Sequence, residues 1–140
     1  MPAVPAVPAR FTALVATADA LLSDTLGGPL TRAGRDRGAA YALRIALETV
    51  VDAALTVREP GLRKVTMRAK ILCLRHYAGV DVAHRVNALW NALSAGCKYH
   101  HDELGPSRAQ VRAWRKTLGA LATELAAPGA SADGHTASAD

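Results

Sequence analysis

Apolar residues recur three and four positions apart along most of the chain, which is the spacing of one face of an α-helix. Five segments show this pattern, and Gly or Pro residues separate them. The pattern predicts helices over residues 11–26, from between 31 and 38 to about 57, and over 62–78, 81–104 and 107–127. Short connections favour antiparallel neighbours, so the predicted fold class is all-α, an up-and-down bundle of about five helices.

Residues suited to capping stand before the last two helices. Asp81 precedes the fourth apolar pattern, and its carboxylate can accept hydrogen bonds from the free N–H groups of a first helical turn. Ser107 and Gln110 have the spacing of a capping box. We therefore expect the fourth and fifth helices to begin at Asp81 and Ser107.

The third segment has apolar residues on two sides of its helix. We expect its buried arc to consist of Leu62, Val65, Ala69, Leu72, Cys73 and His76. Met67, Ile71 and Leu74 then fall inside a basic arc, where a solvated face would not favour them. We expect a second copy of the chain to cover that side, in a homodimer formed through the third and fourth helices.

The two ends of the chain differ from the segment between them. Residues 1–8 contain the repeat PAVPAVP, which prevents a helix, and residues 128–140 are small and polar. We expect two flexible tails around one helical-bundle domain at 9–127. No apolar run is long enough to span a bilayer, and the start lacks the pattern of a secretory signal, so a cytoplasmic protein without a membrane partner is predicted.

The composition is typical of a helical protein with a basic surface. Hydrophobic residues make up 50% of the chain and aromatic residues only 4%, so Ala, Leu and Val supply most of the apolar share. Ala is the strongest helix former. The net charge of +5 and the pI of about 9.7 favour acidic partners. Cys73 and Cys97 fall on apolar helix faces, which indicates small core side chains rather than a disulfide or a metal site.

Basic side chains cluster on the third and fifth helices. The candidate residues for binding a partner or a nucleic acid are Lys64, Arg68, Arg75, Arg108, Arg112 and Arg115. Cations at helical spacing can contact phosphates, and such binding depends on salt and is indifferent to base sequence. The surface is therefore expected to bind a protein, or RNA or DNA non-specifically; the alternative is a solvated face.

The fourth helix has a polar stripe with little charge. It consists of His84, Asn87, Asn91, Ser94, Lys98 and His101, at spacings of three and four. Amide, hydroxyl and imidazole groups together can line a site or a polar interface. A mildly polar exterior is the alternative interpretation.

Reactive side chains are densest in residues 97–104. His100 continues the apolar seam of the fourth helix, so it is either a buried histidine or an acid–base group in a cleft between helices or subunits. His100 and Glu103 could supply two metal ligands, but two ligands do not make a site. We therefore predict no metal and no other cofactor.

Residues 67–118 resemble a family of small all-helical proteins of unassigned function from high-GC bacteria. The resemblance is carried by Met67-Arg68-Ala69-Lys70-Ile71-Leu72-Cys73-Leu74-Arg75, Leu89-Trp90, Leu93-Ser94, Cys97, Glu103-Leu104-x-Pro106-Ser107 and Val111-Arg112-x-Trp114. The centre of that family is similar to the signature of HEPN-type helical bundles, in which an Arg and a downstream His cleave RNA across a dimer interface. The resemblance places this His at His100, whereas Ala95 stands where the family has the Arg.

The function expected from these features is that of a small interaction module, dimeric and non-enzymatic, that binds a protein or RNA through its basic surface. The alternative is a HEPN-like ribonuclease, or an inactive relative of one, with His100 as general base. Ala95 has no donor that could stabilise the charge developing on a phosphate, so efficient RNA cleavage is not expected.

Overall fold

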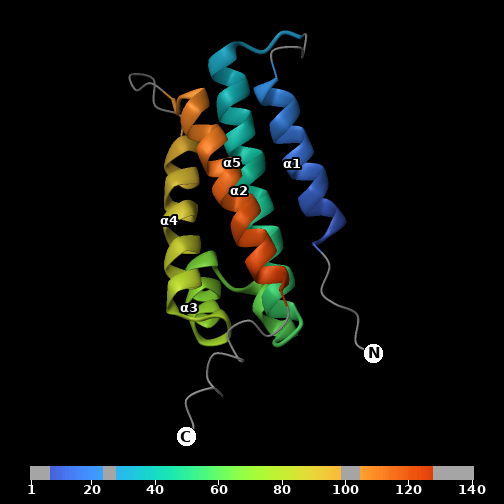
Figure 1. Cartoon of the computed structure of the whole chain (residues 1–140), viewed down its shortest axis with the longest axis vertical. Helices are drawn as coiled ribbons and strands as arrows, with labels where there is room; N and C mark the ends of the chain where they lie inside the picture. The colour runs from blue at the N-terminus through green and yellow to red at the C-terminus, as the bar shows by residue number, and fades with distance from the viewer. Residues whose placement is uncertain (1–6, 24–27, 99–104, 128–140) are drawn as a thin grey trace, which may run out of the picture.

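The computed structural model describes residues 7–23, 28–98 and 105–127 (Figure 1). Within them lie five α-helices and one 3₁₀ helix: α1 (Ala9–Leu22), α2 (Arg32–Thr56), η1 (Pro60–Lys64), α3 (Met67–Ala78), α4 (Val80–Cys97) and α5 (Arg108–Ala126). Four long helices run alternately up and down the long axis, and the short α3 lies at one end (Figure 1). The predicted all-α, up-and-down bundle is confirmed.

Parts of the sequence-based predictions fall on residues that the structure does not describe. The C-terminal tail at 128–140, most of the leader at 1–8, and His100 with His101 lie outside the described residues. None of the helices in the described ranges is long and apolar enough to cross a membrane.

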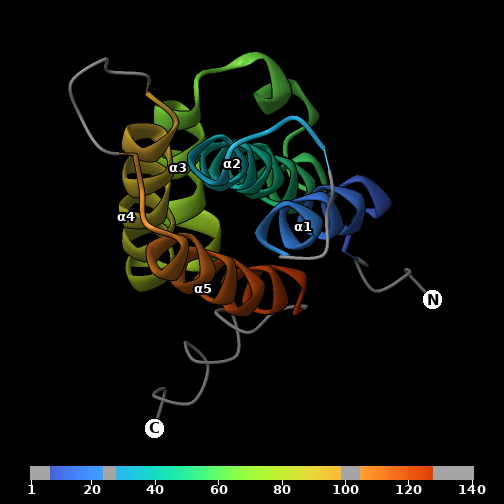
Figure 2. The same ribbon diagram turned by 90° about the horizontal axis from the view of Figure 1, so that it is seen from above.

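Helix α2 is the centre of the bundle. It contacts each of the other α-helices, and α1, α5 and the α3–α4 pair surround it when the bundle is viewed from above (Figure 2). Its buried apolar residues are Ala39, Ala40, Ala42, Leu43, Ala46, Leu47, Val50, Val51 and Leu55. Alanines on several sides let the neighbouring helices approach closely, while the leucines and valines fill the core.

Two predicted helices differ from the observed ones near their ends. Helix α1 ends at Leu22, because Ser23 is extended, so the predicted continuation to residue 26 is wrong. The predicted helix over 62–78 is two elements: Val65 is extended after η1, and the Thr66 side chain accepts from the backbone N–H of Ala69 to cap α3. The cap competes successfully with a continuous helix because it satisfies a free donor of the first turn.

Helix α3 packs on the face opposite to the predicted one. Met67, Ile71 and Leu74 are buried in the core, whereas Leu72 is 63% exposed and His76 is also exposed. The predicted buried arc is therefore wrong, because the break at Val65 frees α3 to turn its other apolar stripe toward α2 and α4. Since Met67, Ile71 and Leu74 are core residues, they no longer give a reason to expect a second copy of the chain on this side.

The ends of α4 and α5 confirm one of the two predicted caps. Gly79, at φ 97°, is the N-cap of α4, and Asp81 instead lies in the first turn, paired with Arg85 at 3.1 Å. The capping box of Ser107 and Gln110 is present in both directions. Helix α4 ends at Cys97, before an extended Lys98, so the predicted helix does not continue through Lys98, and its predicted part over 99–104 lies outside the described residues.

Two buried cations, Lys70 and Arg108, hold α3 and α5 against α2 through ion pairs. Lys70, only 2% exposed, lies 2.7 Å from Asp52 and 3.4 Å from Glu48. Arg108 donates from Nε to Asp36 Oδ1 over 3.0 Å, and both side chains are buried. These pairs fix where α3 and α5 begin relative to the central helix.

Candidate functional site

The three predicted arginines of α5 each contact another helix or its end, and Arg108 is buried, whereas Arg112 is exposed and Arg115 partly exposed. Arg108 is buried against Asp36, Arg112 donates to the carbonyl oxygen of Leu22 over 3.3 Å, and Arg115 donates twice to Asp19. These contacts connect α5 to α1 and α2. We therefore exclude Arg108, Arg112 and Arg115 from the candidate site.

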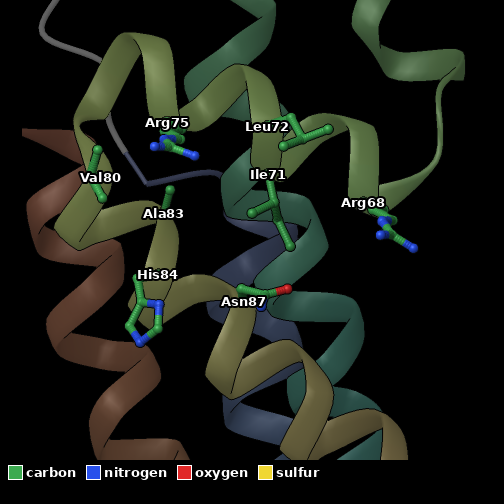
Figure 3. A pocket seen from close by; sticks show the side chains of 8 residues that line it. All are labelled: Arg68, Ile71, Leu72, Arg75, Val80, Ala83, His84 and Asn87. Carbon is green, nitrogen blue, oxygen red and sulfur yellow. The ribbon is translucent and has the colours of Figure 1, made fainter.

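Two of the other predicted cations, Arg68 and Arg75, line a groove between α3 and α4. The described residues that line it are Arg68, Ile71, Leu72, Arg75, Val80, Ala83, His84 and Asn87, and its volume is about 300 Å³ (Figure 3). It combines the predicted basic residues of the third helix with the predicted polar stripe of the fourth. Lys64, on η1 just before α3, is also exposed.

The helical repeat and one glycine explain why these side chains meet. On α3, Arg68, Leu72 and Arg75 lie four and three residues apart and therefore share a face. Val80, His84 and Asn87 have the same spacing on α4. Gly79 joins the two helices with a positive φ that other residues rarely adopt, so α4 turns back at once alongside α3.

The groove has an apolar floor and exposed apolar rims. Ile71 and Ala83 are buried at its base, whereas Leu72 is 63% and Val80 is 59% exposed. Large aliphatic side chains with this exposure, close together and rimmed by polar groups, are typical of binding surfaces. The structure thus turns Leu72 outward, although its pattern in the sequence indicated a core residue.

The charge of the groove is positive and has no compensation among the residues that line it. Neither Arg68 nor Arg75 forms an ion pair with any described residue, and the lining set contains no carboxylate. Figure 3 shows the two arginines on either side of Ile71 and Leu72, with His84 and Asn87 across from them on α4. A ligand with carboxylate or phosphate groups and an apolar part would match this arrangement.

The predicted polar stripe follows α4 away from the groove. His84, Asn87, Asn91 and Lys98 are exposed, and Ser94 is half-buried. His84, Asn87, Asn91 and Ser94 have helical spacing within α4, whereas Lys98 is extended just beyond the end of the helix and His101 lies outside the described residues. The stripe therefore connects the groove with the far end of α4.

Cys97, at the last turn of α4, and Cys73, on α3, are free thiols that pack partly against the core. Burial raises the pKa of the Cys97 thiol, and the nearby Arg44 guanidinium offsets a smaller part of that rise. Arg44 is not among the predicted site residues, because its proximity to Cys97 depends on the packing of α2 against α4.

Alkylation of Cys97 by iodoacetamide is expected to require a higher pH than alkylation of a free cysteine, because only the thiolate reacts. In a Cys73→Ser background, the midpoint of the pH–rate profile should lie above that of glutathione. Arg44→Gln should move it higher still, since the cation that favours the thiolate is removed. A midpoint that falls in Arg44→Gln would contradict this assignment.

No protein-family model matches the chain, and no match was found among curated proteins or solved structures.

The structure does not test the acid–base chemistry predicted for His100. His100 and Glu103 lie outside the described residues, and Ala95 is an exposed residue in the last turn of α4. Within the described ranges, no group of three His, Cys, Asp or Glu side chains is placed to hold a metal ion.

Proposed function

We propose that this protein is a non-enzymatic binding module that holds an acidic, partly apolar protein segment in the groove between α3 and α4. The observation that carries the proposal is the pair Arg68 and Arg75, which lack a counter-charge among the described residues and flank an apolar floor. Carboxylates of the segment pair with the two guanidinium groups, and an aliphatic side chain packs on Ile71 and Ala83.

Each side chain of the groove has a separate part in this binding. A guanidinium group binds a carboxylate through two parallel hydrogen bonds, which sets its orientation as well as its charge. His84 and Asn87 offer both donors and acceptors, so they can hold the backbone of an extended segment. Leu72 and Val80 gain contact when the segment covers them, because both are largely exposed in the free protein.

The composition of the groove favours a protein segment over RNA. Single-stranded RNA is commonly held by bases stacked on aromatic side chains, and no Phe, Tyr or Trp is among the described lining residues. Three of the six predicted nucleic-acid contacts, those on α5, already contact other parts of the fold, although Arg108 alone among them is buried. The exposed aliphatic rims match the side chains of a protein better than a phosphate backbone.

We expect selection from a display library of random peptides to enrich Asp and Glu together with Leu, Ile or Val. Peptides of about 16 residues span up to about 50 Å when extended, which is ample for the groove. The double substitution Arg68→Gln/Arg75→Gln should lower the affinity for the selected peptides by about ten- to a hundred-fold, which is the range for the loss of hydrogen bonds to charged groups. Fluorescence anisotropy of labelled peptides measures the change.

The matched control is Arg10→Gln/Lys116→Gln, which removes the same charge from exposed positions on α1 and α5. Its affinity should stay within about twofold of the parent, because salt screens distant surface charges. Three results would overturn the proposal: selected peptides without an acidic preference, tighter binding of a labelled single-stranded RNA at physiological salt, or a homodimer that Leu72→Glu dissociates in sedimentation.

A further inference from the structure

The contact between α2 and α4 continues beyond the end of α3. Helix α3 has 12 residues, whereas α2 has 25 and α4 has 18, so α3 lies along only one end of the pair (Figure 1). Farther along, α4 exposes Asn91 and Lys98, and Tyr41 of α2 is 55% exposed. We call the region formed by Arg44, Trp90, Ser94 and Lys98 the α2–α4 seam.

The seam contains two buried polar atoms without hydrogen bonds. The Arg44 guanidinium lies over the Trp90 ring, 4.6 Å from its centroid, and Arg44 Nε has no hydrogen-bond partner in the described part of the chain. Ser94 Oγ, one helical turn beyond Trp90, also lacks one. Because an unsatisfied buried donor is costly, both groups would gain from an acceptor supplied by a ligand.

The charges near Arg44 favour a negatively charged group as the acceptor from the ligand. Glu48 follows Arg44 by one turn of α2, but it pairs with Lys70 at 3.4 Å. Arg44, which is half-buried, has no ion pair with a described residue, and Lys98 adds an exposed cation just after the end of α4. Two cations and two unsatisfied donor groups match a carboxylate, which brings negative charge and several acceptor positions.

We infer that the α2–α4 seam is a second carboxylate-binding point, used by the same acidic segment that fills the groove. The inference rests on the proposed function, because one segment is to occupy both places. From Asn87 at the groove to Ser94 at the seam the distance along α4 is seven residues, or about 10 Å. The segment therefore carries acidic residues at two places separated by about this distance, bridged along Asn91.

Trp90 provides a direct readout of the seam. In a Trp114→Phe background, Trp90 is the remaining tryptophan, and a carboxylate that draws Arg44 from its ring changes the fluorescence. Titration with fluorescein-labelled poly-L-glutamate at low salt is expected to give a saturable change in Trp90 emission together with a rise in anisotropy. Poly-L-lysine is expected to give neither.

Variants separate the seam from the groove. Arg44→Gln should abolish the change in Trp90 emission and lower the affinity for poly-L-glutamate by about tenfold. Ser94→Ala should lower this affinity by about threefold. Arg32→Gln, which removes the same charge from the exposed start of α2, should leave the Trp90 response intact. Arg68→Gln/Arg75→Gln should weaken binding but retain the emission change at saturation.

The outcomes distinguish the two claims. Suppose that poly-L-glutamate binds, that Arg68→Gln/Arg75→Gln lowers its affinity, and that the Trp90 emission does not change. The proposal for the seam is then overturned, whereas the proposed function of the groove is supported. A Trp90 response that survives in Arg44→Gln also overturns the seam. If the protein does not bind poly-L-glutamate even at low salt, the seam is overturned, whereas the proposed function is decided by the display selection, whose peptides also carry aliphatic side chains.

Discussion

Arg108→Met is expected to lower the free energy of unfolding by about 3–5 kcal/mol, the largest effect that we predict for removing one side chain. Arg108 Nε donates to Asp36 Oδ1 over 3.0 Å, and both side chains are buried where α5 begins against α2. The methionine leaves the Asp36 carboxylate inside the protein without this cation, and desolvation of an unpaired charge is expensive. Urea unfolding followed by circular dichroism measures the loss.

The control for this prediction lies on the same helix. Arg115 also pairs with an aspartate, Asp19 at 3.1 Å, but both side chains are substantially exposed. Arg115→Met should therefore cost less than about 1 kcal/mol, as exposed ion pairs do. The double variant Asp36→Leu/Arg108→Met should recover most of the stability lost by Arg108→Met, because no charge remains buried at the site. Equal losses for Arg108→Met and Arg115→Met would refute the importance of burial here.

Lys70→Glu is expected to destabilise the protein by about 3–5 kcal/mol, since it places a carboxylate at a buried position beside two partly exposed carboxylates. Lys70 is 2% exposed and lies 2.7 Å from Asp52 and 3.4 Å from Glu48. In the variant, three carboxyl groups meet where α3 packs on α2. The unfolding midpoint in urea should fall accordingly, and the protein should lose part of its α3 helicity before it unfolds.

Arg68→Glu is the matched control, because it makes the same charge change two positions away on α3. Arg68 is exposed and has no ion pair with a described residue, so its substitution should change the stability by less than about 1 kcal/mol. The comparison tests the orientation of α3 directly. If Arg68→Glu were the more destabilising of the two, the observed orientation of α3, with Lys70 buried and Arg68 exposed, would be contradicted.

The ion pairs of Lys70 also affect the proposed binding. Lys70 holds α3 to α2, and Arg68 and Arg75 project from the other side of α3 toward the groove. A helix of 12 residues is too short to be stable by itself, so its tertiary contacts fix the positions of the groove arginines. Binding of an acidic segment therefore depends on packing at α2 as well as on the groove residues themselves.

Much of the fold could be predicted from periodicity and local chemistry. The five helical segments, the capping box at Ser107 and the core positions Leu43, Leu47 and Leu93 all follow from spacing along the chain. The polar stripe of His84, Asn87 and Asn91 is likewise predicted to share one side of α4, and the structure shows these residues exposed. Such features depend on residues within a few turns of one another, which is why sequence reasoning reaches them.

The candidate site could be predicted only in part. Arg68 and Arg75 are among the predicted cations, but Leu72, Val80 and Arg44 are not among the predicted site residues, and nothing in the sequence indicates the buried ion pairs of Lys70. Their roles depend on which face of α3 meets α2, and on how α4 lies beside Arg44. Nothing in the local spacing distinguishes a lysine that finds two carboxylates across the bundle from one that remains in solvent.

The sequence by itself determined that this chain forms α-helices, nearly where they end, and that its surface is basic, because helix propensity, capping and charge are local properties. Only the tertiary structure decided which apolar stripe of α3 is buried and which cations remain unpaired. Helix α3 carries apolar residues on two sides, so either stripe could have been buried. Packing against α2, with Lys70 reaching Asp52 and Glu48, selected one of them and left Leu72, Arg68 and Arg75 exposed beside α4.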